Sequence, residues 1–130
     1  MSKDVGIIVP NYKTLELTRL CLSVLKLNTD LSRAEVIVID NASNDASSEY
    51  LASLDWITFL QRTETEKAGG GIAHARALDL GLKYITAPFV MVMHTDTFLI
   101  KKDWLDFLLA QFDTDNVAGV GSWKLEFKPR

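Results

Sequence analysis

Two short stretches of almost uninterrupted apolar residues constrain the fold more than any other feature of this chain. They are residues 5–10 (VGIIVP) and residues 35–40 (EVIVID). A strand with one face in water alternates apolar and polar residues, so these runs predict strands that are buried on both faces. Strands of that kind occur almost only in parallel sheets that helices cover on both sides.

Segments with helical patterns alternate with these strands. Behind Thr14, a suitable N-cap, helical spacing relates the apolar residues Leu17, Leu20, Cys21, Val24 and Leu27. We expect further helices over residues 47–54, 73–85 and 102–112, and further strands over residues 56–60, 89–93 and 117–123. The alternation predicts one domain, residues 1–130, with a three-layer α/β/α sandwich and a mostly parallel, Rossmann-like sheet. We expect the strand at residues 89–93 to be buried and central.

Composition and charge exclude several classes of protein. The net charge of −3 gives no electrostatic basis for binding nucleic acid or an anionic membrane. Cys21 is the only cysteine, which excludes an intrachain disulfide, and its apolar helical context predicts a small core residue. A strand follows Met1 almost at once, and no apolar run approaches the roughly 20 residues that span a bilayer. We therefore expect no signal peptide, no transmembrane segment and a cytoplasmic location.

Polar residues follow three of the expected strands at the point where each ends. They are Asn11 and Tyr12 after the first strand, Asp40 and Asn41 after the second, and the segment 94–96 after the fourth. In open α/β sheets, ligands bind just outside the carboxyl ends of the strands. The sequence therefore predicts one ligand site at this edge of the sheet.

His94 and Asp96 are the strongest candidates within that site. If the chain stays extended, their spacing sends both side chains to the same side, where an imidazole and a carboxylate can share a divalent cation. The alternative is structural, since Asp96 or Thr97 can cap the next helix or loop. We favour a metal or substrate contact, because a carboxylate directly after a buried strand has few structural reasons to be there.

Other candidates leave two interpretations open. Asp40 can hold the backbone of the following turn, or it can accept hydrogen bonds from a nucleobase or ribose. Three glycines ending at Gly71 precede a helix and suit either a flexible loop or the close approach of a phosphate. In that helix, Arg76 can bind a diphosphate or pair with Asp79, and His74 can serve as a neutral hydrogen-bonding group or as an ordinary surface residue.

Five segments then occur in a recognisable order. They are VGIIVPNY (5–12), LCLSVL (20–25), VIVIDNASND (36–45), GIAHARALDLGL (71–82) and HTDT (94–97). This ordered set resembles the family 2 glycosyltransferases, which have the GT-A fold, and it covers nearly the whole chain. The last segment falls where that family has its Asp-x-Asp metal motif.

The resemblance implies that the chain binds a nucleoside-diphosphate sugar, most often a UDP-linked one. It implies that Pro10 and Tyr12 contact the nucleoside, that Asp40 binds the base, and that Asp96 ligates Mn²⁺ or Mg²⁺. The ion would neutralise charge on the departing diphosphate. The remaining expected contacts to the nucleotide sugar are Asn11, Asn41, Gly71, His74, Arg76 and Thr95.

Two features depart from the family pattern. His94 replaces the leading Asp of the metal motif, which should weaken the hold on Mg²⁺ and is more acceptable to Mn²⁺. Only about 34 residues follow Asp96, whereas inverting members of the family keep their general base in an acceptor-binding half beyond the metal motif. The chain therefore looks like a donor-binding half without its acceptor half, and no residue stands out as the general base.

The leading hypothesis is a glycosyltransferase-like protein that transfers a sugar to an acceptor hydroxyl with inversion. One alternative is a nucleotide-sugar-binding module, or a relic, without turnover of its own. A nucleotidyltransferase is the other, although no glycine-rich loop directly follows the first strand. We also expect apolar surface around residues 117–127 to favour self-association or a companion chain.

Overall fold

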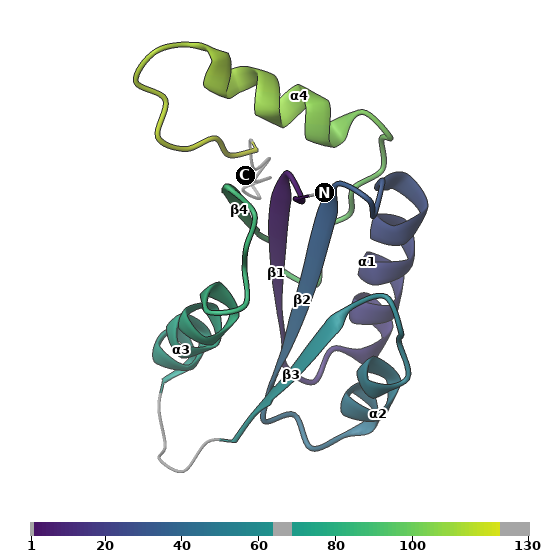
Figure 1. Cartoon of the computed structure of the whole chain (residues 1–130). Coiled ribbons are helices and arrows are strands. Elements are labelled where there is room, and N and C mark those ends of the chain that lie inside the picture. Colours follow the sequence, from purple (N-terminus) through teal and green to yellow (C-terminus); the bar gives the residue numbers. More distant parts are fainter. Residues whose placement is uncertain (1, 64–68, 123–130) are drawn as a thin grey trace, which may run out of the picture.

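The computed structural model describes residues 2–63 and 69–122, and in them it has a four-stranded, all-parallel sheet with helices on both faces (Figure 1). The strands are β1 (Val5–Asn11), β2 (Ala34–Asn41), β3 (Thr58–Arg62) and β4 (Phe89–Val92). Their order across the sheet is β3-β2-β1-β4. This arrangement confirms the three-layer α/β/α, Rossmann-like architecture expected from the sequence.

The two apolar runs form the centre of the sheet. In the parallel register of β1 and β2, Ile7 is opposite Val36 and Ile8 is opposite Ile37. Ile7 and Val36 belong to one hydrophobic cluster and Ile8 and Ile37 to another, since successive side chains point to opposite faces. Both faces of these strands are covered, which explains why no polar residue interrupts the runs.

Helices α1 (Leu15–Asn28) and α2 (Ala46–Ala52) lie on one face of the sheet, and α3 (Gly70–Leu82) lies on the other (Figure 1). Helix α4 (Trp104–Ala110), followed by a 3₁₀ turn (Gln111–Asp113), packs with the α1 cluster through Trp104 and Leu105. The indole N–H of Trp104 donates to the Thr29 hydroxyl at 3.1 Å, just beyond the end of α1. In the described residues, no helix is both long enough and apolar enough to cross a bilayer.

Helix α1 was expected from its apolar spacing, but its buried face differs from the one that this spacing suggests. The buried residues are Thr18, Cys21, Leu22 and Leu25. Leu20 and Leu27 are 52% and 73% exposed, and Leu17 is exposed as well. Helical spacing holds for both sets of leucines, and the packing against β1 and β2 selects only one of them.

Strand β4 is not central within the described sheet. It pairs with β1 alone, and Val90 and Val92 remain 45% and 46% exposed. Helix α3 packs over β1 and β2, so the α3 side of β4 is left uncovered. The prediction of a strand buried on both faces was therefore wrong for β4, although Met93, directly after it, is buried.

The expected last strand is absent from the part of it that the structure describes. Residues 117–122 form neither strand nor helix, and Trp123 lies outside the described residues. Gly119 and Gly121 weaken strand formation here, and no described strand pairs with the segment. Of the apolar surface expected over residues 117–127, the structure shows Val120 at 38% exposure, and residues 123–127 are not described.

Candidate functional site

A cavity of about 540 Å³ opens at the carboxyl ends of β1 and β2. Seven of the residues selected from the sequence line it: Pro10, Asn11, Tyr12, Asn41, His74, His94 and Thr95. The other lining residues are Thr14, Ala42, Gly70 and Ala73. Residues from three strand ends and from the first turns of two helices therefore meet around one space, as expected for a ligand site in a parallel sheet.

Asn11, at the end of β1, is fully buried and forms hydrogen bonds to several elements at this edge of the sheet. Its Nδ2 donates to Asp40 Oδ1 at 2.8 Å and to Ser47 Oγ at 3.0 Å. Its Oδ1 accepts a hydrogen bond from Thr18 Oγ1 at 2.6 Å. One amide thus connects the ends of β1 and β2 to helices α1 and α2.

Asp40 is fully buried beneath the cavity and does not line it. Besides Asn11, its carboxylate accepts the Ser48 hydroxyl at 2.7 Å and the backbone N–H of Ser43 at 3.3 Å. The turn that it holds contains Ala42, whose φ of 59° lies in the left-handed region that favours glycine. Of the two roles considered for Asp40, the contacts in this structure are those of turn support.

Thr14 joins the start of α1 to the segment after β4. Its hydroxyl lies 3.1 Å from that of Thr95 and 3.0 Å from that of Thr18, and it makes no side-chain N-cap hydrogen bond. Thr14, which was expected to be an N-cap, thus links α1 to the segment after β4 through its hydroxyl group. Through this link, the segment that carries His94 and Asp96 is connected to the same buried network as Asn11.

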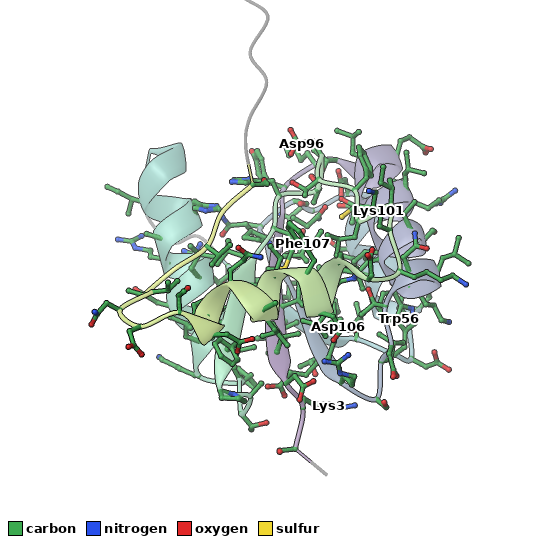
Figure 2. All side chains as sticks on the ribbon, turned by 90° about the horizontal axis from the view of Figure 1, so that it is seen from above. Lys3, Trp56, Asp96, Lys101, Asp106 and Phe107 are labelled. Carbon is green, nitrogen blue, oxygen red and sulfur yellow. The ribbon has the colours of Figure 1, made fainter. Side chains whose placement is uncertain are left out.

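His94 and Asp96 do not share one side of an extended chain. The segment makes a turn in which the Thr97 N–H donates to the His94 carbonyl at 3.1 Å. The His94 ring stacks on that of His74, with ring centroids 5.0 Å apart and planes 6° from parallel. Asp96 is exposed at the outer edge of the molecule and does not line the cavity (Figure 2). The premise of an extended chain at this point was wrong.

These side chains fit a divalent ion only as part of a larger ligand set. In residues 2–63 and 69–122, no three His, Cys, Asp or Glu side chains are grouped closely enough to hold a metal ion. One imidazole and one carboxylate are acceptable donors to Mn²⁺, and Mg²⁺ prefers oxygen ligands alone. An ion bound by His94 or Asp96 would therefore need its remaining ligands from elsewhere, such as a diphosphate and water.

The negative charge of Asp96 acts on a buried thiol, that of Cys21. Cys21 is fully buried, and its thiol lies 3.9 Å from the His94 carbonyl oxygen. Burial first, and then the charge of Asp96, raise the pKa of Cys21 to about 11. The thiol is therefore protonated at neutral pH and behaves as a small core group.

The glycines and Arg76 differ in how they relate to the cavity. Gly70 lines it, whereas Gly71 and Arg76 are exposed on α3 outside the lining. Arg62, at the end of β3, was not selected from the sequence. Its Nη1 donates to Asn41 Oδ1 and to the Ala73 carbonyl. An arginine that ends a strand is common, and no local pattern indicates that it will hold two residues of a cavity wall.

Comparison with known proteins assigns the chain a family and a fold. Residues 6–128 match the family model described as Glycosyl transferase family 2. No curated protein sequence matches.

Two of the similar solved structures come from an archaeon and a bacterium. One is the mannosyltransferase PcManGT from Pyrobaculum calidifontis in complex with GDP-Man and Mn²⁺, with a TM-score of 0.69 and 24% identity over 90% of this chain and 34% of that chain. The other is S. aureus TarS 1–349 in complex with UDP-GlcNAc, with a TM-score of 0.65 and 23% identity over 95% of this chain and 37% of that chain. This chain thus spans little more than a third of either structure, and at these identities the likeness shows a shared GT-A fold.

Proposed function

Because the chain belongs to the family 2 glycosyltransferases, we propose that its cavity binds the nucleoside diphosphate of a sugar donor. The observation that carries this proposal is the meeting of three strand ends around one space of about 540 Å³. That volume falls within the roughly 300–1,000 Å³ of small-molecule sites. The site also lies where open α/β sheets bind their ligands.

We assign the nucleoside to the part of the cavity formed by Pro10, Tyr12 and Asn41. The Tyr12 side chain is 57% exposed, so its ring is available for stacking on a base. Two similar structures support a nucleotide ligand, since PcManGT was solved with GDP-Man and TarS with UDP-GlcNAc. We propose a UDP-linked donor. We assign Asp40 to the support of this region, because its carboxylate is buried and engaged by the turn.

The diphosphate belongs on the opposite side, near His74, His94 and Thr95, with Gly71 and Arg76 on the adjoining turns of α3. We propose that a divalent cation, Mn²⁺ or Mg²⁺, would be held at this edge by phosphate oxygens together with His94 and with Asp96, whose exposed side chain lies outside the cavity lining. When bound, such an ion neutralises charge that develops on the leaving diphosphate. Thr95, tied to Thr14, fixes the backbone between the two proposed ligands.

The proposed reaction is transfer of the sugar to an acceptor hydroxyl, with inversion. In the described residues, no Asp or Glu side chain lines the cavity, so none is in place as a general base. Asp106, for example, pairs with Arg33 at 2.8 Å on another part of the surface. We therefore assign donor binding to the described residues. The same observation favours a second candidate function, a nucleotide-sugar-binding module without turnover.

A calorimetric titration of the chain with UDP, GDP and TDP, each with Mn²⁺, with Mg²⁺ and without metal, tests the proposal. We expect UDP to bind most tightly, and more tightly with Mn²⁺ than with Mg²⁺. The His94→Asp variant restores a second carboxylate and should bring Mg²⁺ close to Mn²⁺. Failure of all three nucleotides to bind would overturn the proposal. Metal-dependent release of UDP from a UDP-sugar would exclude the module without turnover.

A further inference from the structure

The three most exposed large apolar side chains in the described residues belong to one corner of the molecule. They are Ile100, Leu27 and Phe107, which are 75%, 73% and 65% exposed. No other large apolar residue in the described part of the chain exceeds 57%. One such side chain alone is common on a protein surface, but the three largest exposures in one place indicate a surface that meets something apolar.

Hydrogen bonds hold the end of α1 against the start of α4 (Figure 1). Nδ2 of Asn28 donates to the carbonyl of Leu99 at 2.9 Å, in addition to the bond of Trp104 described above. The Asn28 bond brings Leu27 and Ile100, each next in sequence to one of its partners, to the same corner. This corner lies about 20 Å from the cavity, at the far end of α1, because the helix has 14 residues with a rise of about 1.5 Å each.

Two lysines follow directly in the same segment. Lys101 and Lys102 are exposed, and neither forms a salt bridge with a described residue. Figure 2 shows Lys101 and Phe107 on the same side of α4, opposite Asp106. The charge of Asp106 is compensated by Arg33, at 2.8 Å. The corner therefore combines protruding apolar side chains with two exposed ammonium groups.

We propose that this basic apolar corner (Leu27, Ile100, Phe107, Lys101 and Lys102) binds the surface of a lipid bilayer that contains anionic lipid. The apolar side chains would enter the boundary between headgroups and acyl chains, and the lysines would lie among the anionic headgroups. A bilayer fits better than a protein partner, because lysine is depleted from protein–protein interfaces. Neither the candidate site nor the cavity between β4 and α4 includes a residue of the corner, so its side chains protrude from a surface without a hollow.

Charge determines how much the lysines contribute. The net charge of −3 predicts no long-range attraction of the chain to an anionic membrane. At physiological salt, however, charges act over only about 8 Å, so the residues at the contact decide. Asp103, which is exposed in the same segment, offsets part of the lysine charge. The apolar side chains should therefore supply the larger share of the binding, and the lysines should supply the preference for anionic lipid.

Sedimentation with vesicles tests the proposal, using phosphatidylcholine mixed with phosphatidylserine and phosphatidylcholine alone. Ile100→Ser combined with Phe107→Ser should weaken binding to the mixed vesicles about a hundredfold, because two apolar side chains no longer enter the bilayer. Lys101→Gln combined with Lys102→Gln should weaken it about tenfold. The lysine substitutions should not change the weaker binding to phosphatidylcholine alone.

A control variant carries Ile72→Ser and Lys83→Gln. It removes an exposed apolar side chain and an exposed charge at α3, away from the corner, and should leave vesicle binding unchanged. Thermal unfolding checks that each variant is folded. Titration with UDP should give the affinity of the unsubstituted chain for every variant, because the corner is remote from the cavity.

Absence of sedimentation with the mixed vesicles would overturn the inference, and so would binding that the corner substitutions leave unchanged. An equal loss in the α3 variant would also overturn it, since that result indicates adsorption without a defined surface. In each of these cases the proposed function stays in place. A chain that sediments with the vesicles as expected but binds no nucleotide would support this inference and overturn the proposed function.

Discussion

The side chain of Asn11 is completely buried, and both ends of its amide are engaged by other buried groups. Asn11→Ala would leave Asp40 and Thr18 short of partners at a site that water does not reach. We expect a loss of about 2–3 kcal/mol in the free energy of unfolding, measured by urea denaturation. Gln61→Ala, an exposed change near the end of β3, should stay within about 0.5 kcal/mol of wild type. Equal stability of both variants would contradict the role given to Asn11.

For individual residues, the sequence predicted where the site lies better than it predicted what each side chain does there. Polar residues after buried strands lie at one edge of a parallel sheet, and seven of the eleven residues that line the cavity were selected in advance. Whether a side chain such as Asp40 faces a ligand or a turn depends on partners like Ser48 and Asn11, which spacing does not reveal. Arg62 was missed for the same reason, since its partner Asn41 is 21 residues away.

Among the secondary-structure elements, α1 has leucines that should contribute very differently to stability. Leu25 is fully buried in the cluster under β1, and Leu27 is 73% exposed. Leu25→Ala should lower the free energy of unfolding by about 2–5 kcal/mol, because it removes buried methyl groups and leaves a cavity. The matched Leu27→Ala should change it by less than about 0.5 kcal/mol. Urea denaturation of both variants checks this, and a larger loss at Leu27 would show that the helix is rotated from its described position.

Strands β1 and β2, and the helices that cover both of their faces, could be predicted from the sequence. Only a strand covered on both faces has so long an apolar run. The same argument failed for β4, whose run is just as apolar. Its composition does not reveal that α3 covers the neighbouring strands instead. The helices were found from their periodicity, but their ends moved by a few residues, as with α3, which was expected at residues 73–85 and spans Gly70–Leu82.

At the scale of the whole molecule, we expect the clearest effect on behaviour from the edge of β4 that no described strand pairs with. Val90 and Val92 are exposed beside backbone groups that no described strand pairs with. Exposed apolar strand edges favour association. The expectation of self-association thus stays a prediction, and we assign it to β4 in addition to the segment first considered.

Val92→Lys places a charge on this edge and should lower the apparent mass measured by light scattering at high protein concentration. Leu27→Lys places the same charge on the exposed face of α1 and should leave the mass unchanged. A chain that is monomeric before any substitution would remove the basis for the prediction. A fall in mass with Leu27→Lys alone would move the contact to α1.

The bond between Thr14 and Thr95 connects residues 81 positions apart, and through Asn11 it joins them to the turn after β2. Hydroxyl, amide and carboxylate groups therefore form a connected network beside the cavity, and the protein makes these bonds without a ligand. We expect a ligand of a different shape to bind weakly, because it would have to break several of these hydrogen bonds. A ligand that fits should bind with a small entropic cost, because these groups of the protein are already ordered.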